Sequence, residues 1–284
     1  MWKALCLLAA SSLVSGSPGL GAESLATLFV PIAAHLPAAN GETWASDLRL
    51  YNPAHEDVSA GLTFLSDGKD NSAASEVSVT VRAGRALLLD DVVLKTFGLM
   101  GSGAIRIRSS VSLVASSSTY LVAPFGFPGV TEPRKETFQT AAADETEWSS
   151  SASRVLSVAN RFRDIEAGPS VRDSYTNVGL LNPSSDTIFL ALTLVDEDRF
   201  APLGTKTLSL PPYGFAQIVD LFDAFGVSDV RLENAVLSIG AAKGTPLAFQ
   251  PAPVLAYAVR QTSTFDGCGG FSKQADFLFA QRVP

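Results

Sequence analysis

The stretch Ser46-Asp-Leu-Arg-Leu-Tyr-Asn-Pro53 returns in similar form as Thr176-Asn-Val-Gly-Leu-Leu-Asn-Pro183. A constant offset carries the first stretch onto the second, and the interval is far longer than the 20–50 residues of a solenoid repeat. It has the size of a whole domain, so the sequence predicts one domain written twice. The same offset aligns Leu62-Thr63 with Leu192-Thr193, Gly84 with Gly214, and Asp90 with Asp220.

Apolar residues alternate with polar ones in both copies. Leu48 and Leu50 alternate in the first copy, and Leu190, Leu192 and Leu194 alternate in the second. This period of two is typical of antiparallel strands with one buried and one wet face. Turn signals separate about seven such strands in each copy, at the spacing of a sandwich. We therefore expect an all-β protein of two tandem antiparallel β-sandwich domains.

Composition and position set the expected domain limits. The segment 141–151 is small, polar and acidic and has no period, so it is predicted to be a linker. The first domain is expected at 25–140 and the second at 152–284.

Several residues that recur in both copies are predicted to be structural. Each copy has one short helical element, with an acid to cap its start and a glycine to end it. The duplicated acids are more readily explained as helix caps than as catalytic groups. The residues assigned structural roles are Asn52, Asn182, Gly84, Gly214, Asp90, Asp220, Gly98 and Gly226.

The run from Phe29 to Trp44, followed by Asp47-Leu-Arg-Leu-Tyr-Asn-Pro53, resembles a repeated immunoglobulin-like β-sandwich of secreted bacterial proteins. Such domains occur in tandem or beside exported enzymes. The resemblance covers both copies, although 159–175 departs from it by an inserted loop and a missing Trp. It implies an immunoglobulin-like fold and export, and it carries over no catalytic residue.

Composition excludes several classes of protein. The chain has 284 residues, 46% of them hydrophobic and 17% charged, which excludes disorder. Its net charge of -7 provides no basic surface for nucleic acid. His35, His55, Cys6 and Cys268 are its only histidines and cysteines, so we expect no metal site and no cofactor.

The first 22 residues have the pattern of a cleavable secretory signal. Lys3 supplies a positive charge, Ala4 to Val14 is mostly apolar, and small residues follow. No later run is long enough to span a membrane. The mature protein is therefore expected to be secreted, periplasmic or held at the cell surface, with Cys268 as its lone thiol.

Candidate contact residues are aromatic. Trp44 is expected to be either a buried plug or a ligand contact. Phe125, Phe127 and Trp148 lie in loops, where they would either form an exposed interface or pack against the neighbouring domain. A Ser-His-Asp triad built on His35 or His55 stays open, but no serine is singled out. The acidic turn Asp196-Glu197-Asp198 lacks the spacing of a calcium loop, so a solvated turn is favoured.

Three functions follow from these observations. The first is a non-enzymatic exported module for adhesion, scaffolding or envelope association, with an envelope or extracellular protein or glycan as partner. The second is a carbohydrate- or protein-binding accessory domain, which needs a row of exposed aromatics. The third is a hydrolase, which needs a polar cleft. The absence of clustered catalytic groups in the sequence favours the first.

Overall fold

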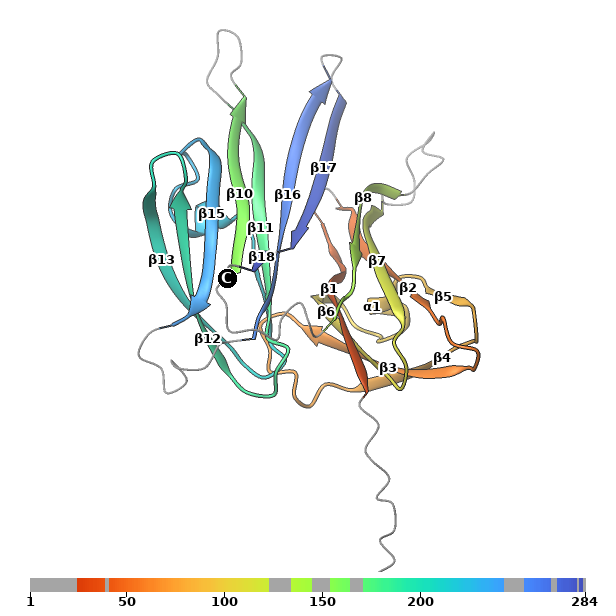
Figure 1. Ribbon diagram of the computed structural model, residues 1–284. Helices are drawn as coiled ribbons and strands as arrows, with labels where there is room; N and C mark the ends of the chain where they lie inside the picture. Colours follow the sequence, from red (N-terminus) through yellow and green to blue (C-terminus); the bar gives the residue numbers. More distant parts are fainter. Residues whose placement is uncertain are drawn as a thin grey trace, which may run out of the picture.

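The computed structural model describes residues 25–38, 41–122, 134–144, 154–163, 171–242, 253–266, 270–279 and 281–282 (Figure 1). These residues form strands almost throughout, with two short helices. The strands divide into two antiparallel assemblies of the same design, one from each half of the chain. The predicted all-β fold of tandem β-sandwich domains is confirmed.

The first domain has two layers of strands. Neighbours run β4-β3-β6-β1 in one layer and β5-β2-β7-β8 in the other, and β9 pairs with the free edge of β1. The elements are β1 (Ala26–Pro37), β2 (Thr43–Tyr51), β3 (Val58–Ser66), β4 (Glu76–Val81), β5 (Ala86–Leu89), α1 (Val92–Lys95), β6 (Gly101–Ser109), β7 (Val114–Val122), β8 (Arg134–Ala141) and β9 (Ala143–Asp144).

Strand β1 joins the two layers. Its residues up to His35 pair with β6, whereas Leu36 and Pro37 pair with β2 in the opposite layer. A bulge between Val30 and Ala33 accompanies this passage. Bulges bend a strand, which allows one strand to contribute to both sheets of a sandwich.

The second domain repeats this plan pair by pair. Its layers are β13-β12-β15-β10 and β14-β11-β16-β17, with β18 on the edge of β10. The elements are β10 (Arg154–Arg163), β11 (Val171–Leu181), β12 (Ile188–Asp196), β13 (Ala201–Leu210), β14 (Phe215–Ile218), α3 (Leu221–Ala224), β15 (Leu232–Ala241), β16 (Leu255–Asp266), β17 (Gly270–Phe279) and β18 (Gln281–Arg282).

Each domain has an apolar core between its layers. Leu48, Leu50 and Leu62 are fully buried in the first core, and Leu190 and Leu192 lie in the second. The alternation read from the sequence thus turns one face of each strand inward, because successive side chains point to opposite faces.

The predicted linker is partly structured. Ala143 and Asp144, two residues of the expected linker 141–151, form β9 and pair with Phe29 and Leu28. Ala143 is buried, so this residue is packed as part of the first domain and is not an exposed linker residue. The first domain therefore extends beyond residue 140, and residues 145–151 lie outside the described part of the chain.

Candidate functional site

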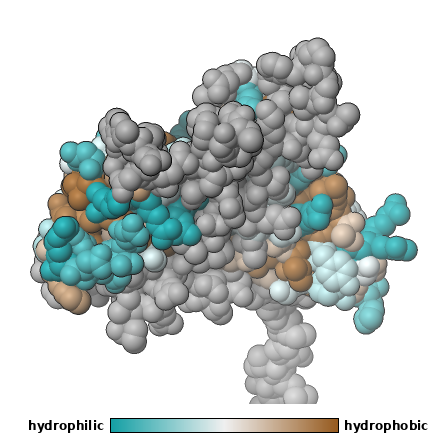
Figure 2. Space-filling model, turned by 90° about the horizontal axis from the view of Figure 1, so that it is seen from above, coloured by the Kyte–Doolittle hydropathy of each residue, from teal (hydrophilic) through white to brown (hydrophobic). Residues whose placement is uncertain are grey.

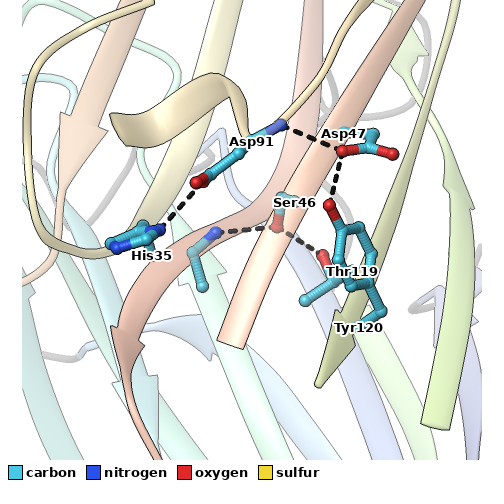
Figure 3. Close-up of polar contacts among 7 residues, drawn as sticks. His35, Ser46, Asp47, Asp91, Thr119 and Tyr120 are labelled. Carbon is cyan, nitrogen blue, oxygen red and sulfur yellow. Dashed lines mark hydrogen bonds and ion pairs between the residues drawn. The ribbon is translucent and has the colours of Figure 1, made fainter. Parts of the chain in front are cut away.

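A polar cluster lies where β1, β2, β7 and the turn before α1 meet (Figure 3). His35 Nδ1 lies 2.9 Å from Asp91 Oδ1, and each of the two side chains is 15% exposed. The sequence had left open a triad on His35, and the structure pairs this histidine with Asp91. No local pattern pointed to Asp91, because the two residues are 56 positions apart.

Asp47 links Asp91 to Tyr120 within the cluster. Its Oδ1 accepts hydrogen bonds from Tyr120 Oη at 2.7 Å and from the backbone N–H of Asp91 at 2.9 Å (Figure 3). Asp91 has a left-handed backbone, with φ of 44°. The buried Asp47 carboxylate therefore holds β7 and a conformationally costly turn in place.

The serine of the cluster connects strands. Ser46 Oγ accepts a hydrogen bond from the backbone N–H of Ala34 at 2.8 Å and lies 2.7 Å from Thr119 Oγ1. Ser46 is fully buried. A nucleophilic serine needs a base within hydrogen-bond reach. The contacts seen here for Ser46, among the described residues, go to Ala34 and Thr119, so Ser46 is not paired with His35 as a triad serine would be.

The second domain repeats the backbone-holding part of the cluster. Asn177 occupies the place of Asp47, and its Oδ1 accepts a hydrogen bond from the N–H of Asp220 at 2.8 Å. Asp220 is also left-handed, with φ of 51°. An amide serves here as well as a carboxylate does in the first domain. The shared role of these two positions is therefore structural.

The histidine is particular to the first domain. Strand register places Asn160 where the first domain has His35. The Asn160 side chain is fully buried, and its Nδ2 donates to the carbonyls of Val230 at 2.7 Å and Ser228 at 3.0 Å. The chemistry available to the first domain alone is thus a His-carboxylate pair with a small exposed face.

Asn52 and Asn182 make matching contacts in the two copies. Both side chains are fully buried at the end of a strand. Asn52 Nδ2 donates to the carbonyls of Glu56 at 2.7 Å and Val81 at 3.0 Å, and Asn182 Nδ2 donates to those of Asp186 at 2.6 Å and Leu210 at 3.2 Å. Each amide thereby bonds both to a carbonyl of the loop that follows its own strand and to a carbonyl at the end of β4 or β13.

The offset between the two copies becomes one residue shorter after the β3–β4 hairpin of the first copy and the β12–β13 hairpin of the second. Gly84 N donates to Ala54 O, and the same bond in the second copy is made by Tyr213 N to Ser184 O. Gly84 therefore corresponds to Tyr213, not to Gly214 as the constant offset predicted. One residue fewer lies between β12 and the end of β13 than between β3 and the end of β4, and the same shift is found at the helix caps.

The same shift moves the helix caps. The N-cap of α1 is Asp91, one residue after the predicted Asp90, because Asp91 corresponds to Asp220. Asp220 accepts a bond from Asp223 N at 3.2 Å, whereas Asp91 makes no side-chain cap and bonds to His35 instead. Gly98 and Gly226, which follow the helices, have φ of 66° and 71°.

A third apolar cluster joins the two domains. It lies between the β1-β3-β6 layer of the first domain and the β14-β11-β16 layer of the second. Its buried members are Phe29, Ile32, Leu65, Ala104 and Ala143 from the first domain, and Leu181, Phe215, Leu255, Tyr257 and Val259 from the second. We call this cluster the junction. The sequence predicted a core for each domain but did not predict this one.

Trp44 packs against the junction and is half-buried. It is therefore a packing residue between domains, where the sequence had left open a plug or a ligand contact. Phe125, Phe127 and Trp148, the other predicted contact residues, lie outside the described part of the chain.

Backbone groups reinforce the junction. Gly68 N donates to Phe215 O at 2.8 Å, and Gln217 N donates to Asp67 Oδ1 at 3.2 Å. Asn71 Nδ2 donates to Tyr213 O at 3.0 Å. The loop between β3 and β4 thus bonds to the turn and edge strand of the other domain, which fixes the orientation of one domain against the other.

Tyr213 occupies a strained position at the junction. Its φ is 49°, a conformation that costs an L-residue about 1–2 kcal/mol. The guanidinium carbon of Arg106, a first-domain residue, lies 4.4 Å from the centroid of the Tyr213 ring. The matching position in the first copy is a glycine, so the tyrosine is present despite the strain and supplies a contact between domains.

Burial at the junction perturbs two ionisable groups. Burial beside the second domain raises the pKa of Asp67, although bonds from Gln217 and Gly68 oppose the shift. Burial, followed by the charge of Asp67, raises the pKa of Tyr257 well above its ordinary value. Both groups therefore favour their neutral forms more than they would in water.

The acidic turn after β12 is organised by a single arginine. Asp196 is buried, and its Oδ2 accepts a bond from Arg199 at 2.6 Å. Across the residues described by the structure, no group of three or more His, Cys, Asp or Glu side chains is arranged to hold a metal ion. No helix within that part of the chain is long and apolar enough to cross a membrane.

Comparison with protein-family models gives no match, and no curated protein is significantly similar to the chain. The resemblance to a secreted immunoglobulin-like repeat thus stays a prediction.

Proposed function

We propose that the chain is an exported, non-enzymatic β-sandwich module that serves in adhesion, scaffolding or envelope association. The observation that carries this proposal is the junction. Ten buried apolar side chains and several hydrogen bonds join two sandwiches that each have a core of their own. A large apolar contact between domains restricts their relative motion, as a module that positions partners requires.

The polar groups support the same interpretation. Asp47, Ser46 and Asn52 are buried and bond to backbone or to neighbouring strands, and matching residues do so in the second domain. Catalytic groups need an accessible place for substrate and a partner poised to move a proton. Side chains that hold strands together, in the same way in both domains, need neither a place for substrate nor a proton-transfer partner.

The His35–Asp91 pair offers the sharpest test against enzyme activity. His35→Asn installs the residue that the second domain has at the same place, so the fold is expected to tolerate it. We expect fluorogenic ester, peptide and glycoside substrates to be hydrolysed no faster by the full chain than by this variant. Turnover by the full chain that His35→Asn removes, without a change in melting temperature, would contradict the proposal.

Envelope association is tested by incubating the full chain with isolated envelope fractions and with soluble extract from the producing cells. We expect retention by the envelope or by an envelope protein. The matched control is a chain with Leu181→Ala, which loosens the junction while leaving the polar surface unchanged. Equal recovery from soluble and envelope fractions would argue against an envelope role.

The runner-up function is a carbohydrate-binding accessory domain. It needs an aromatic row on one surface, and Trp44 packs at the junction instead. A glycan array distinguishes the two proposals: a specific sugar signal favours the accessory domain. We expect Trp44→Ala to lower stability and to leave any sugar signal unchanged.

A further inference from the structure

The junction covers one outer face of the second domain. Phe215, Leu181 and Leu255 lie side by side on β14, β11 and β16, and all three point away from the core of their own domain. The first domain buries them. We call this three-stranded surface the front face, and the β1-β3-β6 surface that covers it the back face.

Among the residues that the structure describes, nothing covers the front face of the first domain in this way. Its residues at the matching positions are Ala86, Tyr51 and Val114 on β5, β2 and β7. Tyr51 is 43% exposed, Val114 is 61% exposed, and the neighbouring Leu88 is 49% exposed. Viewed from above, apolar and hydrophilic residues lie side by side on the first domain, at the right of Figure 2.

The back face of the second domain is also uncovered within the described ranges of the chain. Val195 and Val236, adjacent on β12 and β15, match Leu65 and Ala104 of the junction. They are half-buried, whereas Leu65 and Ala104 are completely buried beneath the second domain. The two complementary halves of the junction are thus repeated, one at each end of the chain.

Charge on the adjoining loops is complementary. In the junction, the β3–β4 loop bonds to the β13–β14 turn. The matching β12–β13 turn carries exposed Glu197 and Asp198, while its third acid, Asp196, is neutralised by Arg199.

The opposite side carries the excess of positive charge. The β4–β5 turn, which matches the β13–β14 turn, carries exposed Arg82 and Arg85, and Arg49 lies beside Leu88 on the front face. Two exposed acids, Glu56 and Asp57, lie on the adjoining loop between β2 and β3, and Asp57 accepts a bond from Ala83 N of this turn, so the three arginines leave a smaller excess of positive charge. A net acidic loop would therefore meet a net basic turn if the back face of one chain covered the front face of another.

We propose that copies of this chain associate head to tail, with the back face of one second domain covering the front face of the next first domain. The contact repeats between chains the junction that exists within each chain. Because it joins two different surfaces, it does not close on itself as a two-fold contact does, and it adds chains in series. This inference rests on the proposed scaffolding role and deepens it. A rigid non-enzymatic module can act as a single chain, so a result that overturns head-to-tail association leaves the proposed function standing.

Sedimentation velocity of the full chain over about a hundredfold range of concentration is the first measurement. We expect a progression from monomer to dimer and longer species as concentration rises. Added salt should weaken it, because salt screens the pairing of the acidic loop with the basic turn. A chain that stays monomeric throughout, or that stops at a dimer, overturns the proposal.

Two variants block the two faces separately. Leu88→Glu with Val114→Glu places charges on the exposed front face, and Glu197→Lys with Asp198→Lys reverses the charge of the back-face loop. Each pair is expected to weaken association about tenfold or more. Mixing the two variants leaves one intact front and one intact back, so a dimer that contains one of each should form.

The control is Met100→Ser, which removes an apolar side chain that is 67% exposed and lies outside both faces. It should assemble as the unaltered chain does. Circular dichroism melting establishes that each variant is folded. If the front variant blocks association and the back variant does not, the contact is front to front and the proposal is wrong. The same holds if the mixture stays monomeric.

Discussion

Tyr213 shows how a single residue connects the two domains. A left-handed backbone favours glycine, which the first copy has at the matching position as Gly84, with φ of 60°. The second copy has tyrosine there, and its ring lies over Arg106 of the other domain. The strain in one turn is thus offset by a contact that neither domain makes alone.

Replacing Tyr213 separates strain from contact. Tyr213→Ala loses the ring and keeps the strain, whereas Tyr213→Gly loses both, so the glycine variant should be more stable by about 1 kcal/mol. Chemical denaturation measures the difference. Gly84→Ala is the matched control, since an added Cβ meets no atom there; it should cost a similar amount. Equal stability of the two Tyr213 variants would show that the position is unstrained.

Asp67 makes the junction sensitive to pH. Its pKa is raised in the folded chain from the ordinary 3.8, chiefly by burial, so the folded state binds the proton more tightly than the unfolded state. Its contribution to the free energy of unfolding is therefore fully favourable at acid pH and is lost as pH rises through the folded pKa.

Asp67→Asn keeps an oxygen for the Gln217 N–H and removes the charge. We expect the melting temperature of this variant, relative to the unaltered chain, to rise between about pH 3 and about pH 7. Subtracting the melting temperature of the unaltered chain at each pH removes the contributions of the other carboxyl groups, which both proteins share. A relative melting temperature that falls over this range would mean that the junction stabilises the Asp67 carboxylate.

At the scale of elements, the two short helices start in the same way but are capped differently. Asp220 uses its carboxylate to accept from Asp223 N. The carboxylate of Asp91 turns to His35, and the backbone N–H of Asp91 donates to Asp47. The acid is therefore retained at both positions for different reasons, one a local cap and the other a contact between distant strands.

Asp220→Ala should lower the free energy of unfolding by about 1 kcal/mol, because the cap of α3 is lost. Asp90→Ala is the control. Asp90 is exposed and precedes the capping position of α1, so its loss should change stability by less than about 0.5 kcal/mol. Urea titration of both variants makes the comparison. If Asp90→Ala lowered the free energy of unfolding as much as Asp220→Ala does, Asp90 would be the cap of α1, as the sequence predicted.

The strands were predictable because their alternation is local. The correspondence between the two copies after the β3–β4 and β12–β13 hairpins was not predictable. Ser46 to Pro53 and its repeat locate β2 and β11 correctly. The later match of Gly84 with Gly214 was a coincidence of two glycines, one needed for its φ and the other for space. A Cβ on Gly214 would lie 2.7 Å from Cδ of Pro211. Which demand a glycine meets depends on tertiary neighbours that a sequence does not display.

At the scale of the whole molecule, the junction left a weak signal in the sequence. Leu65 and Leu181 follow an inward-facing apolar residue directly, so they break the alternation, and Leu28 to Ala34 is apolar throughout. Strands buried on both faces have this pattern. The His35–Asp91 pair left no signal at all, because it depends on the path of β1 between layers.

Leu180 and Leu181 provide a direct test of how the junction couples the domains. They are adjacent on β11 and fully buried, but Leu180 lies in the core of the second domain and Leu181 in the junction. Replacing either by alanine should cost about 2–5 kcal/mol. Leu180→Ala destabilises one domain, and the intact junction should keep unfolding cooperative across both.

Leu181→Ala weakens the contact between domains, so calorimetry should resolve two transitions where the unaltered chain has one. The comparison is matched in residue, strand and burial, and differs in which surface the side chain covers. Two transitions in the unaltered chain would show that the junction does not couple the folding of the two sandwiches. A single transition in the Leu181→Ala variant would show that the coupling does not depend on the Leu181 contact.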